Sequence, residues 1–177
     1  MHSNRDKQII APLIIVDYDP RWPSLYRVEK NLILGIIGHK VLSIEHIGST
    51  SVLGLGAKPI IDIMACVSGP SDADECVLLL RGIGYTDVTP QEGNPDWFYC
   101  LGKVTHSLGY HLHLMRYASD FSRRHILFRN FLRTHPDVAQ QYYELKKGLA
   151  SKYRSDRVSY TESKTSFIES VVARARQ

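Results

Sequence analysis

The residues best suited to chemistry lie in one segment of the chain, Glu45–Ile63. A predicted strand ends there at Gly48–Ser51, and a glycine-rich loop then leads through Lys58 to an apolar strand that contains Asp62. Glycine lets backbone N–H groups approach a phosphate closely, and serine and threonine hydroxyls add further donors. The segment therefore predicts a phosphate-binding site formed by Gly48, Ser49, Thr50, Ser51 and Lys58.

Asp62 is a carboxylate in an otherwise apolar strand, where an unpaired charge is strongly unfavourable. A later predicted strand contains His111 and His113, and residues two apart in a strand point to the same face. Two imidazoles and one carboxylate suit Zn²⁺, Mn²⁺ or Fe²⁺ better than Mg²⁺, or they act as acids and bases. We predict Asp62, His111 and His113 as catalytic residues and as ligands of a divalent metal, with Mg²⁺, Mn²⁺ and Zn²⁺ left open. The alternative is a pair of half-buried histidines that only form hydrogen bonds.

The spacing of this segment excludes two common phosphate-binding motifs and favours a third. A Walker A loop needs Gly-Lys followed by Ser or Thr, whereas Lys58 precedes Pro59, and the glycines lack the spacing of a dinucleotide-binding fingerprint. Nucleotidyltransferases of the polymerase-β-like fold have Gly-Ser and, about a dozen residues later, two acids one residue apart on a strand. Asp62 matches the first acid, but Met64 occupies the second position. Since two-metal phosphoryl transfer needs several carboxylates, the spacing supports this fold more strongly than this reaction.

The C-terminal third of the chain is basic. Residues 119–177 carry 12 Lys and Arg against 6 Asp and Glu, whereas the preceding residues carry 10 against 12. Arg129 and Arg133 are four residues apart in a predicted helix, so they share a face and are predicted to bind a triphosphate, with Lys146 and Lys164 adding charge. The alternative is a solvated helix face. RNA binding is the weakest reading, because no aromatic and basic platform is present.

Predicted strands and helices alternate before this basic region, and only helices follow. Apolar runs predict strands at residues 13–16, 41–47, 59–67, 97–101 and 108–115. Helical spacing of apolar residues predicts helices at 21–37, 72–83, 120–134, 136–153 and 159–175. The pattern indicates an α/β (α+β) protein: a mixed sheet of the polymerase-β-like kind within residues 1–118, and a C-terminal helical extension, residues 119–177, packed on it as one structural unit.

The composition is that of a globular protein. Of its 177 residues 44% are hydrophobic and 23% are charged, and no apolar run approaches the ~18 residues that a membrane span needs. The first residues are polar and do not resemble a secretory signal. Three widely spaced cysteines indicate neither a disulfide framework nor a zinc knuckle. We expect a cytoplasmic protein that binds a nucleotide or a phosphorylated small molecule. We expect no membrane partner, and nucleic acid is an unlikely partner. The sequence leaves the oligomeric state open.

Taken together, these motifs resemble the GrpB family over nearly the whole chain. The most specific parts are Glu45–Val52 with Lys58–Ile63, and His111–His113 and Phe128–Arg133 add to them. The resemblance implies a nucleotidyltransferase-like α/β core with C-terminal helices in a cytoplasmic bacterial protein. It implies no established reaction.

Three positions depart from the pattern of that family. Leu53 stands where relatives usually have proline, Asn130 where they have aspartate, and Trp97-Phe98 where they have a basic and an aromatic residue. The last change removes one phosphate contact that the family pattern would imply. Two functions follow as hypotheses: a transferase that moves a nucleotidyl group to a small acceptor, and a module that binds the same ligand without catalysis, which Met64 favours.

Overall fold

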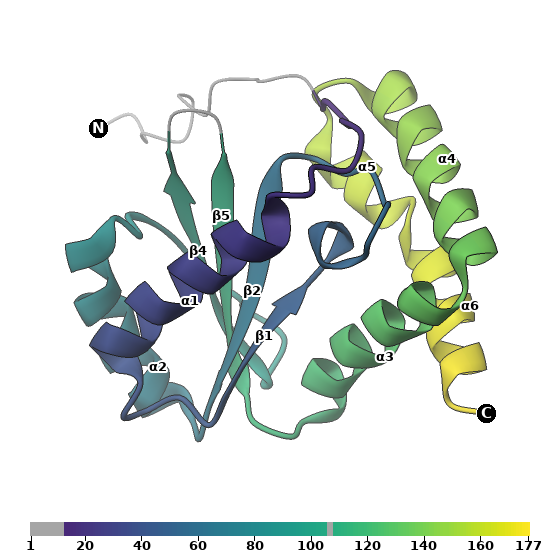
Figure 1. The fold of residues 1–177 in the computed structure, drawn as a ribbon. Helices are drawn as coiled ribbons and strands as arrows, with labels where there is room; N and C mark the ends of the chain where they lie inside the picture. The colour runs from purple at the N-terminus through teal and green to yellow at the C-terminus, as the bar shows by residue number, and fades with distance from the viewer. Residues whose placement is uncertain (1–12, 106–107) are drawn as a thin grey trace, which may run out of the picture.

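A mixed five-stranded sheet forms the centre of the computed structural model, which describes residues 13–105 and 108–177 (Figure 1). The strands are β1 (Ser43–Ile47), β2 (Ile60–Val67), β3 (Asp87–Pro90), β4 (Trp97–Val104) and β5 (Gly109–Arg116). Their spatial order is β1-β2-β5-β4-β3; β2 and β5 are parallel, and the other neighbouring pairs are antiparallel. This arrangement confirms the predicted α+β class with a mixed sheet, and it places β2, β5 and β4 side by side.

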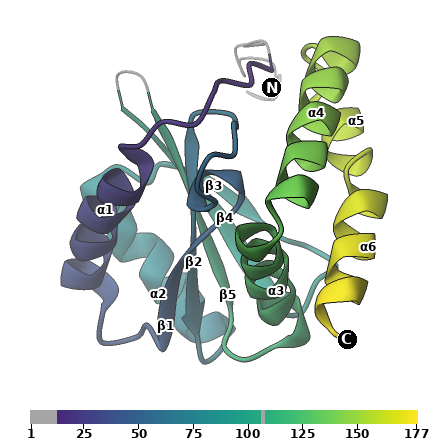
Figure 2. The ribbon, with the colours of Figure 1, turned by 45° about the vertical axis from the view of Figure 1, so that its right-hand side comes forward.

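Helices lie on both sides of this sheet, as Figure 2 shows. One face is covered by α1 (Trp22–Ile37) and α2 (Pro70–Leu80), and α3 (Asp120–Thr134) packs on the other. The chain then continues through α4 (Pro136–Tyr153), α5 (Arg157–Glu162) and α6 (Thr165–Ala175). Apolar residues of α3, α4 and α6 form a separate core over the loop residues Val52 and Leu55. None of the described helices is both long and apolar enough to cross a membrane.

Side-chain alternation along β2 decides what each face of the sheet contains. Ile61, Ile63 and Ala65 belong to the core beneath α1 and α2. Met64 and Cys66 point the other way and pack with Phe121 and Ile126 of α3. Asp62 shares the face of Met64, so it faces the side of the C-terminal helices.

Two predicted elements differ from the structure. The apolar run at residues 13–16 is not a strand: within the described chain only Val16 forms a bridge, to Ala57, and Leu13 packs against Ala150 and Tyr160. The helix predicted at 159–175 is two helices, α5 and α6, that separate at Ser163 and Lys164. Tyr160 of α5 and Val171 of α6 belong to different apolar clusters, so one straight helix would not bury both. The short edge strand β3 was not predicted.

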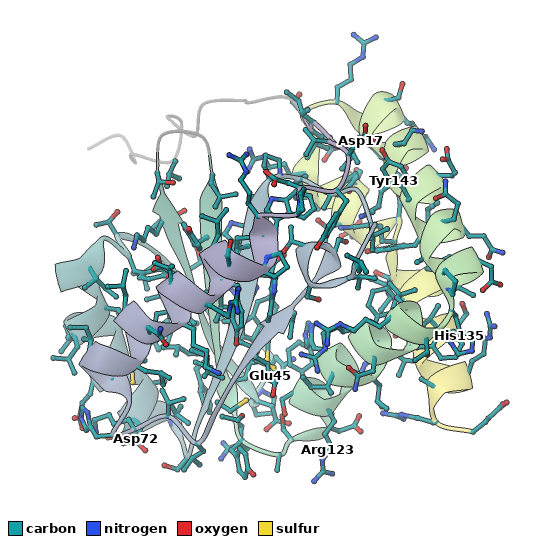
Figure 3. All side chains as sticks on the ribbon, in the orientation of Figure 1. Asp17, Glu45, Asp72, Arg123, His135 and Tyr143 are labelled. Carbon is teal, nitrogen blue, oxygen red and sulfur yellow. The ribbon has the colours of Figure 1, made fainter. Side chains whose placement is uncertain are left out.

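The loop between β1 and β2 is held firmly against α4. The hydroxyl of Tyr143 donates to Asp17 Oδ1 at 2.6 Å, and Figure 3 shows the two side chains together near the start of the described chain. Gly56 lies directly beneath the Tyr143 ring, where a Cβ atom would come within 2.3 Å of Cε2. This close contact needs a glycine and fixes the backbone two residues before Lys58.

Candidate functional site

Asp62, His111 and His113 meet on the sheet face that carries α3. Asp62 is the register partner of His111 across the parallel β2–β5 pair, and His113 lies two residues further along β5. Asp62 Oδ1 is 3.2 Å from His113 Nε2 and 3.5 Å from His111 Nδ1. The exposed fraction of the side chain is 29% for Asp62, 40% for His111 and 14% for His113. The structure thus brings the predicted group together and leaves it accessible.

The two imidazoles set the ionisation of this group. Burial alone would raise the pKa of Asp62, but the His111 imidazole at 3.5 Å and the hydrogen-bonded His113 imidazole outweigh it and hold the pKa below its ordinary range. Burial would likewise lower the pKa of His113, and the Asp62 carboxylate and the Cys100 thiol raise it above its ordinary value instead. Asp62 is therefore ionised at neutral pH, which suits a metal ligand or an electrostatic partner and not a general acid.

The Gly-Ser-Thr-Ser segment begins directly against Asp62. Gly48 has φ +68° and ψ −175°, a conformation that essentially only glycine adopts. A Cβ atom at this position would lie 2.6 Å from Asp62 Oδ2. Glycine is therefore required here both by the backbone and by the carboxylate beside it.

A Gly48→Ala variant is expected to lose about 3 kcal/mol of unfolding free energy, because the strained backbone and the displaced Asp62 side chain add up. Gly54→Ala is the matched control: Gly54 also has a positive φ, +78°, but an added Cβ atom would meet nothing within 4 Å. It should lose only about 1–2 kcal/mol. Urea unfolding measures the unfolding free energy of both variants. Equal losses would show that the contact between the added Cβ atom and Asp62 does not contribute to the destabilisation.

The hydroxyls that follow Gly48 have different surroundings. They lie in a single 3₁₀ turn, η2 (Ser49–Ser51). Thr50 Oγ1 is 3.0 Å from His46 Nε2, and Ser51 Oγ donates to the Gly48 carbonyl at 2.6 Å. Ser49 lies beside Tyr142 of α4 and opposes the rise that burial causes in the pKa of Tyr142. Thr50 and Ser51 therefore stabilise the turn itself, whereas Ser49 faces Tyr142 of α4.

The two arginines of α3 contact the protein backbone. Arg129 Nη1 donates to Glu45 Oε2 at 2.7 Å and to the His46 carbonyl at 2.9 Å. Arg133 donates to the Ser51 carbonyl from Nε at 3.0 Å and from Nη2 at 2.8 Å. These contacts hold α3 against β1 and η2. The predicted phosphate contacts of Arg129 and Arg133 stay a prediction, and the geometry gives both a positioning role.

Three lysines from separate elements gather near Asp62, and we call Lys58, Lys146 and Lys164 the lysine cluster. The Nζ atoms of Lys164 and Lys58 lie 4.3 and 5.2 Å from the centre of the Tyr160 ring. Lys146 is only 3% exposed and donates to the Gly56 carbonyl at 2.5 Å. The sequence suggested Lys146 and Lys164 only as additional charge, and the fold places them beside the predicted phosphate-binding Lys58.

The positive charge of the lysine cluster is only partly balanced: the Asp62 carboxylate raises the pKa of all three lysines, yet each pKa stays below its ordinary value. Burial, together with repulsion from Lys164 and Lys58, lowers the pKa of Lys146 to about 7. Burial and repulsion from Lys58 lower the pKa of Lys164 to about 8, and burial also lowers the pKa of Lys58. Among the described residues, none of the three ammonium groups forms an ion pair with a carboxylate. A bound anion with several negative charges would relieve this repulsion.

Sequence reasoning missed two residues at this site. Cys100 on β4 is the register partner of His113, so it faces the same side of the sheet. His125 of α3 stacks edge-on against Phe121 at 5.2 Å, and burial lowers its pKa to about 4. Strand alternation could have placed Cys100 on one of the two faces of β4, but only the β4–β5 register shows that His113 is its neighbour.

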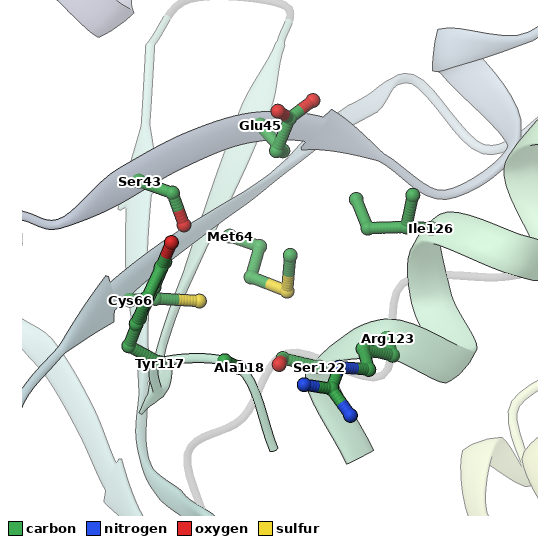
Figure 4. Close-up of a pocket in the computed structure, with 9 residues that line it drawn as sticks. All are labelled: Ser43, Glu45, Met64, Cys66, Tyr117, Ala118, Ser122, Arg123 and Ile126. Atoms are coloured by element: carbon green, nitrogen blue, oxygen red, sulfur yellow. The ribbon is translucent and has the colours of Figure 1, made fainter. Parts of the chain in front are cut away.

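A shallow pocket of about 200 Å³ lies further along the same sheet face (Figure 4). Met64 and Cys66 of β2 line it from the sheet, opposite Ser122 and Ile126 of α3. Met64 is 2% exposed and belongs to an apolar cluster. The position of the second acid in the nucleotidyltransferase pattern is therefore part of a hydrophobic contact in this protein.

Comparison with known proteins agrees with the resemblance inferred from the motifs. Residues 12–174 match the family described as GrpB protein. The chain is 36% identical to a UPF0157 protein of Pseudomonas aeruginosa, over 98% of this chain and 70% of that protein. It is 34% identical to the glutamate-rich protein GrpB of Alkalihalophilus pseudofirmus, over 90% and 94%. The crystal structure of the conserved protein GrpB from Enterococcus faecalis superimposes with a TM-score of 0.81 at 32% identity, covering 92% and 96% of the two chains. The chain belongs to the GrpB protein family.

Proposed function

We propose that this protein binds a nucleotide, or another metabolite with a chain of phosphates, between η2 and the lysine cluster. The observation that carries the proposal is the lysine cluster itself. Three ammonium groups from the β1–β2 loop, from α4 and from the α5–α6 junction gather without a carboxylate partner among the described residues. Buried like charges repel each other, and a polyphosphate is the common metabolite group that matches them.

The roles of the residues follow from their positions. Gly48 and Ser49 lie where the turn approaches the Asp62 carboxylate and Tyr142. Lys58, Lys146 and Lys164 would neutralise the phosphates, while Arg129 and Arg133 hold the turn in place. Asp62, His111 and His113 are the group that would hold a divalent ion, which supplies further positive charge to a bound phosphate when present. Their short mutual distances and mixed nitrogen and oxygen donors fit such an ion.

Transfer of a nucleotidyl group to a small acceptor is the reaction that we propose for this arrangement. The acceptor oxygen would bond to the α-phosphorus while the bond from that phosphorus to its bridging oxygen breaks. Pyrophosphate would leave with its charge on the lysine cluster, and the acceptor proton would pass to water. Gly48, Asp62 and the three lysines would contribute by positioning and charge stabilisation.

Binding without transfer is the second candidate, and one observation favours it. Met64 lies in an apolar cluster where a two-metal nucleotidyltransferase has its second carboxylate. Two-metal chemistry depends on several carboxylates around the ions. A protein with one strand carboxylate would retain ligand binding and lose the reaction.

Calorimetric titration tests the binding proposal. The ligands are ATP, GTP, CTP, UTP and inorganic pyrophosphate, each with and without Mg²⁺, Mn²⁺ or Zn²⁺. We expect saturable binding by the wild-type protein and a loss of about 10- to 100-fold in affinity for Lys164→Met, the size of one or two charge-assisted contacts. Lys152→Met, an exposed lysine of α4, is the matched control and should bind as the wild type does. No binding of any of these ligands would overturn the proposal.

A further inference from the structure

We propose that Cys100, His111 and His113 are the protein ligands of a zinc-like transition-metal ion, with Asp62 orienting both imidazoles. The inference deepens the metal role proposed above for the Asp62 group, and rests on it. It adds the Cys100 thiolate to the ligands. It also changes the role of Asp62 from a direct ligand to a carboxylate that contacts the ligating histidines and orients them. Both points concern the ion alone, so they can be measured without a nucleotide.

Two adjacent strands place the three donors together. His111 and His113 lie on β5, and Cys100 lies directly opposite His113 on β4. One donor atom from each residue falls within 4.8 Å of the other two. Because these donors stand on paired strands and not on a loop, their relative positions are fixed by the sheet hydrogen bonds.

The contacts of His113 match those of a metal-bound histidine. Its Nε2 atom faces the Asp62 carboxylate at 3.2 Å, while its Nδ1 atom is buried and has no hydrogen-bond partner among the described residues. An orphaned buried nitrogen is unfavourable unless something else satisfies it. A histidine that binds a metal through one ring nitrogen usually donates from the other to a carboxylate. Asp62 fills that place for His113, and its Oδ1 atom is also 3.5 Å from His111 Nδ1.

Aromatic side chains enclose this donor set on one side. The centre of the Trp97 ring lies 5.5 Å from the centre of the His113 ring. It lies 5.6 Å from the centre of the Phe121 ring of α3, on which it stacks. Such an apolar wall restricts water and favours binding of the ion by protein donors.

The chemistry of the donors selects the ion. Thiolate and imidazole favour Zn²⁺ and similar transition-metal ions, whereas Mg²⁺ prefers oxygen ligands and retains its waters. Three protein ligands leave one position of a tetrahedral site for water or a substrate oxygen, as in catalytic zinc sites. The site therefore fits a zinc-class ion with one open position.

Loading the 177-residue protein with Co²⁺ tests this proposal, because a cobalt–thiolate bond gives a near-ultraviolet charge-transfer band that imidazole and carboxylate ligands do not give. We expect the band in the wild-type protein and its loss in Cys100→Ser, with Zn²⁺ affinity at least about 100-fold lower in a competition titration against a chromophoric chelator. Cys66→Ser is the matched control: Cys66 is a buried cysteine on the same sheet face and should leave the band unchanged.

Asp62→Asn separates the two roles of the carboxylate. As an orienting residue, its loss should keep the cobalt–thiolate band and lower Zn²⁺ affinity about 10- to 100-fold. Absence of the band in the wild-type protein, or its persistence in Cys100→Ser, would overturn the proposal. Nucleotide binding is measured in the same preparations and does not depend on this outcome. If the protein binds ATP but shows no thiolate band, the metal site alone is refuted. If it shows the band but binds no nucleotide, the proposed function is refuted.

Discussion

A Lys146→Met protein is expected to bind a nucleoside triphosphate about 10- to 100-fold more weakly than the wild type at about pH 6.5, and to show a weaker pH dependence of binding, to which Lys164 still contributes. Burial and the neighbouring lysines lower the pKa of Lys146 to about 7. Its positive charge is therefore present at pH 6.5 and largely absent at about pH 8.5. Wild-type affinity should fall across this window, and the variant should show a flatter profile.

Proton uptake gives a second measurement of the same effect. A bound polyphosphate raises the pKa of Lys146 again, so binding at about pH 7.5 should take up protons. Calorimetry in two buffers with different heats of ionisation measures this uptake directly. Lys152→Met is the control on the same helix and should retain the wild-type uptake. Wild-type affinity that does not change between about pH 6.5 and 8.5 would contradict the role assigned to Lys146.

The stability of the unliganded protein should also depend on pH through Lys146. The pKa of Lys146 is about 7 in the folded protein, against an ordinary value of 10.5 for a lysine in an unfolded chain. Between these values the unfolded chain binds more protons, so the free energy of unfolding rises with pH across that window. Lys146→Met should lack this rise. The variant also loses the hydrogen bond to the Gly56 carbonyl, so its unfolding free energy is compared as a slope against pH and not at a single pH.

An Asp62→Asn protein is expected to lose about 10²- to 10³-fold in any nucleotidyl-transfer rate, because the carboxylate orients the two imidazoles that would hold the ion and supplies the negative charge beside them. Asparagine has the same shape but cannot accept charge-assisted hydrogen bonds from both imidazoles. Transfer is measured with α-labelled nucleoside triphosphates and a panel of small acceptors. Asp87→Asn, an exposed strand aspartate, should leave the rate unchanged.

The outcome also decides between the two proposed functions. Turnover in the wild type that falls in Asp62→Asn supports the transferase. Saturable nucleotide binding with no product from any acceptor supports the binding module and agrees with the buried Met64. A transfer rate in Asp62→Asn equal to that of the wild type would remove Asp62 from the reaction.

Acid titration should show the stabilising contribution of the same residue. The pKa of Asp62 is lower in the folded protein than its ordinary value of 3.8, because the neighbouring His111 and His113 imidazoles outweigh the effect of burial. The stabilisation is thus fully present above that value and is lost as the pH falls below it. Asp62→Asn should therefore be less stable than the wild type at neutral pH, and this difference should shrink in acid.

The sequence by itself determined the local parts of the site. A strand has a two-residue period, so the spacing of His111 and His113 sufficed to put both imidazoles on one face. The chain between Gly48 and Asp62 is a short loop and returns to the neighbouring strand, which is why the glycine and the carboxylate were expected together and meet in the structure. The helix beginning near Trp22 and the helices α3 and α4 also followed from local periodicity, whereas the break between α5 and α6 did not.

Only the tertiary structure decided which distant residues join them. Cys100 faces His113 through a strand register that long-range packing sets, and no local pattern carries that information. Lys146 and Lys164 reach the site because α4 and the α5–α6 junction pack over the β1–β2 loop. The same packing turns Arg129 towards Glu45 and the backbone. Periodicity fixes the side of an element on which a residue lies, whereas burial of the whole core fixes what lies opposite to it.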